Sequence, residues 1–422
     1  MQPLPADVEH AVEALTAEAR AAARALAGAS THAKDGALRA AAAGLRRAER
    51  VVLAANREDV ERTRTAGESA AFLDRLTLTP ERIEIMAQGL EQIAQLPDPV
   101  GETMAAWRRP NGLEIAQVRV PIGVVLSIYE SRPNVTADSA GLCLKTANAV
   151  LLKGGSESQA TNAALADVFR AAIAAEGLPR ATVQLVEGGR DVTRGLLRRD
   201  DRIDVVIARG GEALKRTIIA ESRIPVIKHF EGICHLYVDA TADLDMAERI
   251  CLNGKVQRPG VCNAIENLLV HEAIAPRALP RLVRALRAHG CEVRGDTTVV
   301  RLVPEVTPAT DADWDTEYLD LVLSAAVVPS LDAAIAFIAR HSTGLAEAIV
   351  TESHRAAERF LRDVDSAAVY VNASTRFTDG FEFGFGAEVG ISTNRLHARG
   401  PMGLRELTTY KYLVRGDGQV RA

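Results

Sequence analysis

The chain has 422 residues, more than one ordinary hydrophobic core organises, so two or three domains are expected. Hydrophobic residues make up 47% and charged residues 25%, the balance of a soluble globular protein. The formal net charge of −5 argues against a nucleic-acid partner. No apolar run reaches membrane-spanning length, and the first residues lack the pattern of a signal peptide, so we expect a cytoplasmic protein without a membrane partner.

The five cysteines are odd in number, widely spread, and form no C-x-x-C pair. This pattern argues against a disulfide framework and against a zinc ribbon. A metal site built from Cys234, His235, Cys251 and Cys262 would lack paired spacing, so no metal is expected. A reducing cytoplasm is the simplest interpretation.

The N-terminal part of the chain predicts helices. Residues 6–65 are rich in alanine, with arginines and glutamates at helical spacing, and Asn56 and Gly67 are the expected breaks. Thr79-Pro80-Glu81 then predicts the start of a helix over 80–96. Acidic and basic side chains alternate here, which favours a solvated face over a membrane surface.

Strands and helices alternate after Pro97. We expect strands at 113–120, 123–129, 149–153, 182–186, 204–208 and 225–228, with helices at 158–175, 191–199 and 211–222. A second series has strands at 236–239, 266–271, 319–328, 346–351 and 367–371, with helices at 243–254, 276–289, 331–341 and 353–362. Each series predicts βαβ units and a parallel sheet, hence two α/β domains. Segments 113–120 and 404–415 lie outside both series, and we expect them to pair into a small sheet that joins subunits.

A cysteine in an unusual place is the strongest sign of chemistry. The segment VQRPGVCNAIENLLVH, residues 256–271, places Cys262 in a Gly/Pro turn directly before an apolar strand. A nearby cation, for which Arg258 is a candidate, and backbone amides favour the thiolate, the form that attacks a carbonyl carbon. Inert packing of Cys262 and a surface ion pair for Arg258 are the alternatives.

Two turns between a strand and a helix suit a nucleotide. In LLKGGSES, residues 151–158, Lys153 and Ser156 offer a cation and a hydroxyl beside a helix N-terminus, although a plain turn with a serine cap is the alternative. Gly210 and Gly211 open a helix in the same way. Two such openings at the C-terminal ends of parallel strands suit a dinucleotide.

Two further polar residues carry hypotheses. Asn134, in YESRPNVTADS (129–139), follows a strand, and its amide is a candidate donor to a developing oxyanion; a helix N-cap is the alternative. Glu317 lies in a polar loop just before a strand, where on its own it would be interpreted as a solvated charge.

Together these segments resemble the γ-glutamyl phosphate reductases (glutamate-5-semialdehyde dehydrogenases), a family of the aldehyde dehydrogenase superfamily. The resemblance covers nearly the whole chain, and its carriers are SIYESRPNVTADSAGLCLKTANAVLLKGGSES, IPVIKHFEGICHLYVD, VQRPGVCNAIENLLVH and VYVNASTRFTDGFEFGFGAEVGISTNRLHARGPMGLRELTTYKYLV. It implies an aldehyde-dehydrogenase-like α/β fold. The implied parts are a cofactor domain over 1–110 and 122–233, a catalytic domain over 234–375, and a β-flap for oligomerisation over 111–121 and 400–422.

The resemblance also implies roles for single residues. By position, Cys262 matches the superfamily nucleophile and Asn134 the oxyanion-hole asparagine. Lys153 matches the lysine that contacts the adenosine ribose. Glu317 falls about where a glutamate holds the nicotinamide ribose, although the usual E-x-F-G-P is degraded here to Glu-Tyr-Leu-Asp-Leu.

One departure from the superfamily pattern is informative. Hydrolytic members place a general-base glutamate in E-L-G-G-K, whereas the corresponding text here is KHFEGICH, with Lys228 rather than Glu231 near that position. A base that activates water hydrolyses a thioester, which would be harmful where the thioester must meet a hydride. The departure therefore fits a reductase of an acyl phosphate.

The implied activity is the NADPH-dependent reduction of L-glutamyl 5-phosphate to L-glutamate 5-semialdehyde through a cysteine thioester, the second step of proline biosynthesis. Arg258, Arg376 and the loop around 384–386 are the candidates for substrate contacts, and no residue is identified that reads the 2′-phosphate of NADPH. A homo-oligomer and a functional coupling to glutamate 5-kinase are also implied. The alternatives are a hydrolytic or CoA-acylating aldehyde dehydrogenase, and a non-catalytic scaffold of the same fold.

Overall fold

The structure is a computed structural model that describes residues 4–228 and 231–421. The chain divides into two compact units, each described by itself below. Unit 1 runs to Lys228 and also contains Gly384–Gly390 and the chain from Met402 onward. Unit 2 contains the described residues from 231 to 383 and Ile391–Pro401. The predictions made for residues 1–3 and for His229 and Phe230 within KHFEGICH lie outside the described residues. Among the helices described, none is both long and apolar enough to cross a membrane.

Four helices begin unit 1. They are α1 (Ala6–Leu26), α2 (Thr31–Thr65), α3 (Ala70–Leu76) and α4 (Pro80–Gln95). The start of α4 is as predicted, because the Thr79 hydroxyl accepts a hydrogen bond from the Arg82 N–H at 3.2 Å and Pro80 occupies the first turn. The predicted break at Gly67 is confirmed, since α2 ends at Thr65 and Gly67 has a φ of +85°.

The predicted break at Asn56 is wrong. Helix α2 continues through this residue, and the Asn56 side chain is buried. Its amide donates to the Leu76 carbonyl at 2.9 Å and its side-chain oxygen accepts from the Leu78 N–H at 2.7 Å. The break lies earlier, at residues 27–30, where the Ser30 hydroxyl caps α2. Asn56 therefore fastens the chain that follows α3 to the middle of α2.

A five-stranded parallel sheet of order β5-β4-β3-β6-β7 forms the centre of unit 1. Its strands are β3 (Val124–Tyr129), β4 (Ala149–Gly154), β5 (Val183–Leu185), β6 (Val205–Arg209) and β7 (Val226–Ile227), and its helices are α5 (Asn134–Lys145), α6 (Gln159–Ala175), α7 (Arg190–Leu196) and α8 (Glu212–Glu221). Alternate residues of β3 face opposite ways. Val124, Leu126 and Ile128 pack with residues of α1, α7 and α8. Ser127 and Tyr129 hydrogen-bond to α5 on the other face, so helices cover both faces.

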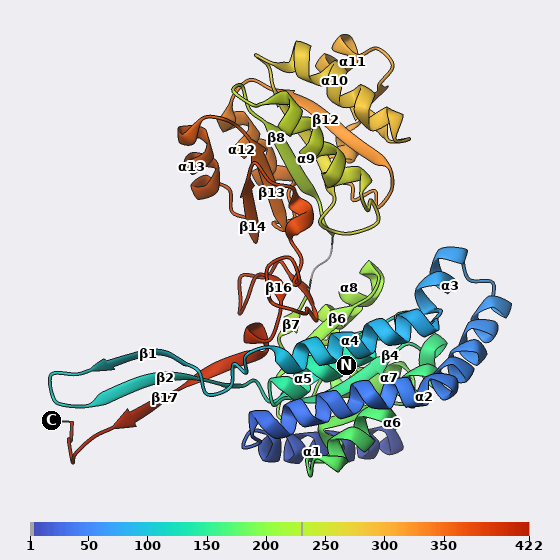
Figure 1. Cartoon of the computed structure of the whole chain (residues 1–422), viewed down its shortest axis with the longest axis vertical. Helices are drawn as coiled ribbons and strands as arrows, with labels where there is room; N and C mark the ends of the chain where they lie inside the picture. Colours follow the sequence, from blue (N-terminus) through green and yellow to red (C-terminus); the bar gives the residue numbers. More distant parts are fainter. Residues whose placement is uncertain (1–3, 229–230, 422) are drawn as a thin grey trace. The chain divides into compact units, whose positions relative to one another are not determined.

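A second, antiparallel sheet of order β1-β2-β17 extends from unit 1 as a long arm (Figure 1). Its strands are β1 (Thr103–Arg108), β2 (Glu114–Pro121) and β17 (Thr408–Arg415). The predicted pairing of 113–120 with 404–415 is present, with Thr408 opposite Pro121 and Arg415 opposite Glu114. Strand β1 was not predicted, because all six of its residues are exposed and they show no alternation of apolar and polar side chains.

Unit 2 is built on a seven-stranded parallel sheet of order β11-β10-β12-β9-β8-β13-β14. Its strands are β8 (Cys234–Val238), β9 (Ile265–His271), β10 (Glu292–Gly295), β11 (Thr307–Pro308), β12 (Val322–Val328), β13 (Ala346–Val350) and β14 (Ala368–Val371). Helices α9 (Leu244–Val256), α10 (Ala275–Ala288) and α11 (Thr297–Leu302) pack in one apolar cluster, and α12 (Leu331–His341) and α13 (His354–Asp363) pack in another. Two short strands, β15 (Gly390–Ser392) and β16 (Gly400–Met402), pair with each other. The fold is therefore α/β with two parallel sheets and a small antiparallel sheet, as predicted.

Candidate functional site

Cys262 lies in the turn between α9 and β9 in unit 2. All five cysteines are described, and Cys262 is the one that is only partly buried. Burial raises the pKa of the Cys143 and Cys251 thiols, and raises the pKa of Cys291 to about 11. A thiol reacts as its thiolate, so Cys262 is the cysteine suited to act as a nucleophile.

Gly232 lies in close contact with the backbone of Cys262. A Cβ atom at Gly232 would lie 1.9 Å from the carbonyl oxygen and 2.6 Å from the Cα atom of Cys262. The Cys234 thiol donates to the same carbonyl oxygen at 3.4 Å. The Gly232 N–H in turn donates to the Glu317 carboxylate at 2.8 Å. Gly232 therefore connects the predicted nucleophile to the predicted ribose ligand, a role that the sequence analysis missed.

Two arginines flank the same turn. The Arg376 guanidinium donates to the Asn263 side-chain oxygen and, at 2.9 Å, to the Gln257 side-chain oxygen. Burial and then the positive charge of Arg258 lower the pKa of Arg376, while Cys262 acts in the opposite direction. Both predicted substrate residues thus lie within electrostatic reach of the turn that carries Cys262. Cations near a thiol favour its ionised, nucleophilic form.

A buried ion pair joins the two elements on either side of this turn. Lys255 near the end of α9 and Glu266 at the start of β9 are fully buried, with 2.5 Å between Nζ and Oε2. Burial raises the pKa of Glu266 to about 7, against the attraction of Lys255, and the charge of Glu317 adds to the rise. The pair holds both ends of the Cys262 turn, and sequence spacing gave no sign of it.

Two of the cofactor candidates, Lys153 and Ser156, lie in unit 1 at the C-terminal end of β4, beside the end of β5. A cleft of about 280 Å³ opens there. It is lined by Lys153, Gly154, Gly155, Ser156, Gln159, Asn162, Leu185, Val186, Glu187, Gly188 and Gly189. Burial lowers the pKa of Lys153, while Glu157 opposes the shift. Lys153 and Ser156 therefore border one cleft large enough for part of a nucleotide.

The alternative interpretation of this turn, a plain serine cap, is wrong. Neither Ser156 nor Ser158 caps α6 through its side chain. The buried carboxylate of Asp59 in α2 does so instead, accepting from the Thr161 N–H at 2.8 Å and from the Thr161 hydroxyl at 2.7 Å. The exposed Ser156 side chain is thus not needed to end the helix.

Gly210 and Gly211 open α8 directly after β6, as predicted, but they do not line the cleft of Lys153. The Gly211 N–H donates to the Glu130 carboxylate at 2.8 Å. A Cβ atom at Gly210 would lie 2.5 Å from the same oxygen. The N-terminus of α8 therefore binds a negatively charged oxygen at close range. The sequence gave no indication that Glu130 would supply it.

Asn134 is the first residue of α5, and its side chain is exposed. The N-cap alternative is wrong, because Pro133 occupies the cap position and no side chain caps this helix. The Asn134 amide instead donates to the Asp138 carboxylate at 3.0 Å. Asp138 lies one helical turn further on. The i,i+4 spacing of an asparagine and an aspartate on a helix would have predicted this contact.

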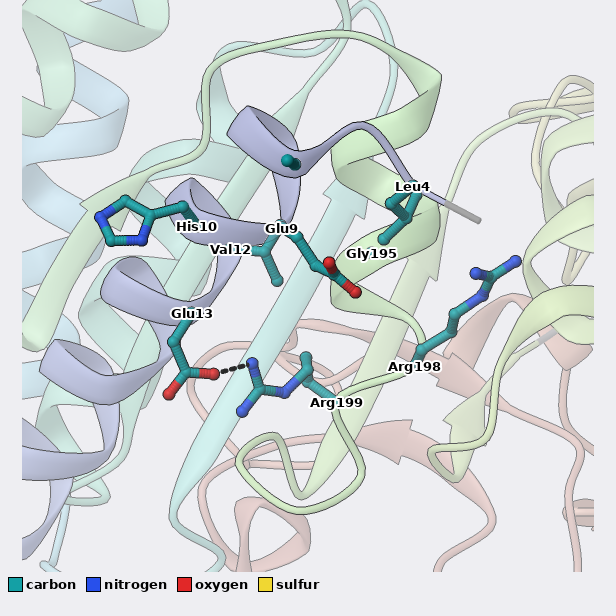
Figure 2. Close-up of a pocket in the computed structure, with 9 residues that line it drawn as sticks. Leu4, Glu9, His10, Val12, Glu13, Gly195, Arg198 and Arg199 are labelled. Carbon is teal, nitrogen blue, oxygen red and sulfur yellow. Dashed lines mark hydrogen bonds and ion pairs between the residues drawn. The ribbon is translucent and has the colours of Figure 1, made fainter. Parts of the chain in front are cut away.

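A larger cleft of about 510 Å³ lies elsewhere in unit 1, beside the first turns of α1 (Figure 2). Its charged groups are partly satisfied by one another, since Arg199 pairs with Glu13, as Figure 2 shows. Arg202 also donates to Glu13 at 2.6 Å. None of the predicted site residues lines this cleft. It is therefore separate from the candidate site.

The family follows from the comparisons with known proteins. The sequence model of the aldehyde dehydrogenase family matches residues 3–313. An acetylating aldehyde dehydrogenase from Geobacillus thermoglucosidasius, only 16% identical, shares the fold with a TM-score of 0.68 over 99% of this chain and 98% of its own. This chain belongs to the aldehyde dehydrogenase family.

Its similarity is greater to one branch of that family. The gamma-glutamyl phosphate reductase of Moorella thermoacetica is 54% identical over 96% of this chain and 97% of its own length. The one from Thermobifida fusca is 53% identical over 98% and 100%. A crystal structure of the gamma-glutamyl phosphate reductase from Thermotoga maritima, 46% identical, has a TM-score of 0.96 and covers 97% of this chain and 100% of that one. The chain groups with the gamma-glutamyl phosphate reductases, as the four sequence segments predicted.

Proposed function

We propose that this chain reduces L-glutamate 5-phosphate to L-glutamate 5-semialdehyde and phosphate with NADPH, through a thioester on Cys262. The observation that carries the proposal is the partly buried Cys262 in a turn flanked by Arg258 and Arg376. The name shared by the relatives, at about half identity over nearly their whole length, supports the same substrate.

Acyl transfer to sulfur is the first step of the proposed reaction. The Cys262 thiolate forms a bond to the acyl carbon, and the bond between that carbon and the phosphate oxygen breaks. The Asn134 amide and the Cys262 N–H donate to the acyl oxygen, which becomes negative after the sulfur attacks and before the phosphate leaves. Arg258 and Arg376 hold the phosphoryl group and its departing charge, because guanidinium groups bind phosphate oxygens in pairs.

The residues of unit 1 fit a dinucleotide. The cleft beside Lys153 and Ser156 offers a cation and an exposed hydroxyl to a phosphorylated ribose. The start of α8 at Gly210 and Gly211 holds the Glu130 carboxylate, and a phosphate would bind there in its place. Glu317 in unit 2 is the proposed ligand of the nicotinamide ribose. When bound, NADPH supplies the hydride that reduces the thioester carbon. The Cys262 thiolate then leaves as the aldehyde forms.

Phosphate dependence tests this function against its enzymatic rivals. With L-glutamate 5-semialdehyde and NADP⁺, we expect NADPH to form only when inorganic phosphate is present. NADP⁺ reduction in water alone would identify a hydrolytic enzyme, and reduction that requires CoA would identify an acylating one. Cys262→Ala should abolish turnover without changing the far-UV circular dichroism spectrum, and substantial residual activity would rule out covalent catalysis at this residue.

The antiparallel arm supports an assembly of identical chains. Trp107, Tyr410 and Tyr412 are exposed on it and their rings contact one another edge to face. We propose that a second copy of the chain covers these rings in a homo-oligomer. The enzyme would act in the cytoplasm, in the second step of proline biosynthesis, coupled to glutamate 5-kinase. Light scattering of the intact protein and of Tyr412→Ser tests the assembly, and a monomeric parent chain would refute it.

A further inference from the structure

The Asp138 carboxylate accepts a hydrogen bond from the Asn134 amide. The two side chains lie one turn apart on α5, with 3.0 Å between the Asn134 nitrogen and an Asp138 oxygen. An ionised carboxylate only accepts hydrogen bonds, so the amide must present its NH₂ group and not its oxygen. Without such a partner, the terminal torsion of an exposed asparagine is broad and two-fold. The carboxylate therefore selects one of two otherwise similar amide orientations.

The surroundings of Asp138 tune its proton affinity. Its carboxyl group is partly buried, and its neighbours on the helix, Ala137 and Ser139, are buried. Burial raises the pKa of Asp138 to about 6, while the Asn134 amide and the positive charge of Arg209 pull it down. Arg209 ends β6, and its positive charge acts on the Asp138 carboxyl group.

We propose that Asp138 is the positioning residue of Asn134, holding one amide N–H so that the other is presented to the substrate oxygen that becomes negative. This inference rests on the oxyanion role proposed above for Asn134. Protonation of Asp138 would replace an acceptor by an O–H donor, which pairs equally well with the amide oxygen. The amide would then turn, and its oxygen would repel the developing charge.

The inference predicts a distinct pattern of kinetics. Asp138→Ala should lower kcat by about 10–100-fold with the KM for L-glutamate 5-phosphate changed less than about threefold, since the donor acts on the transition state. Asp138→Asn offers both an acceptor oxygen and a donor NH₂ group, as the protonated acid does, so its kcat should match the reduced value of the parent enzyme at low pH and should not change with pH around 6. In the parent enzyme kcat should fall as the pH drops through about 6, and this acidic limb should be absent in Asp138→Asn. Matching far-UV spectra establish that each variant folds.

Three further variants make the test decisive. Asp167→Ala removes an exposed acid from α6 in unit 1 and should leave kcat and its pH profile unchanged. Asn134→Ala should lower kcat by about 100–1,000-fold. Adding Asp138→Ala to it should lower kcat no further, because the positioned group is already gone.

The two possible failures are distinguishable. If Asn134→Ala is severely impaired while Asp138→Ala keeps kcat within about threefold and retains the acidic limb, the positioning role is overturned and the oxyanion role stands. If Asn134→Ala itself turns over normally, the oxyanion role proposed for Asn134 is wrong and the positioning role fails with it.

Discussion

Replacement of Gly232 by alanine should disable the enzyme without unfolding it. The added Cβ atom would lie 1.9 Å from the carbonyl oxygen, 2.5 Å from the carbonyl carbon and 2.6 Å from the Cα atom of Cys262. All three atoms belong to backbone, so no side-chain rotation relieves the overlap. The turn of Cys262 must move instead.

The size of the movement follows from the same distances. Real Cβ contacts are essentially never below 3.0 Å, so the Cys262 carbonyl must retreat by at least 3.0 − 1.9 = 1.1 Å. A misplacement of about 1 Å in a reacting group lowers the rate by about 100-fold, which corresponds to about 2.7 kcal/mol of activation free energy. Binding of NADPH should weaken as well, because the Gly232 N–H donates to Glu317, the proposed ligand of the nicotinamide ribose.

The assay is phosphate-dependent NADP⁺ reduction, with cofactor binding measured separately by fluorescence titration. Gly260→Ala is a matched control in the same turn, because its Cβ atom would meet only the Leu319 carbonyl oxygen at an ordinary 3.6 Å. We expect kcat within about twofold of the parent for the control. A folded Gly232→Ala enzyme with kcat within about threefold of the parent would refute this account of how Cys262 is held.

Two other perturbations test the surroundings of Cys262. Lys255→Met leaves the Glu266 carboxylate buried without its partner, so we expect a loss of about 3–5 kcal/mol in the unfolding free energy of unit 2 at pH 8. In the folded variant the pKa of the Glu266 carboxyl lies above its unfolded value of 4.5, so the free energy of unfolding falls as the pH rises. Urea unfolding should therefore show a smaller loss of stability at pH 5 than at pH 8. Equal losses at both pH values would contradict the buried carboxylate as the cause. Iodoacetamide should modify Cys262 at least about tenfold faster than the four buried cysteines, and Arg376→Met should slow that reaction by removing a cation that favours the thiolate. Peptide mass spectrometry measures both rates, and uniformly slow labelling would argue against a nucleophilic Cys262.

The sequence was sufficient for features that depend on neighbours along the chain. The Gly/Pro turn before an apolar strand located Cys262, and the alternation of strands and helices predicted both parallel sheets. The start of α4 followed from Thr79 and Pro80, because a cap and a first-turn proline act within a few residues.

Features made by distant residues could not be predicted in this way. Asp59 caps a helix that begins 100 residues later, at Gln159, and Gly232 binds Glu317 across 85 residues. Asn56 was interpreted as a helix break from its low propensity, but tertiary hydrogen bonds to the chain after α3 override that preference. Partners of this kind become visible only when the fold brings them together.

The arm of unit 1 is completed by the last strand of the chain. Strand β17 pairs with β2 across roughly 300 residues of sequence, and the whole of unit 2 is encoded between them. During synthesis on the ribosome, one edge of β2 therefore stays open until the final residues emerge. A fragment that stops at Lys228 would carry the same open edge permanently, with exposed backbone groups ready to pair with other chains. Expression of this fragment alone thus requires that β17 be joined to it.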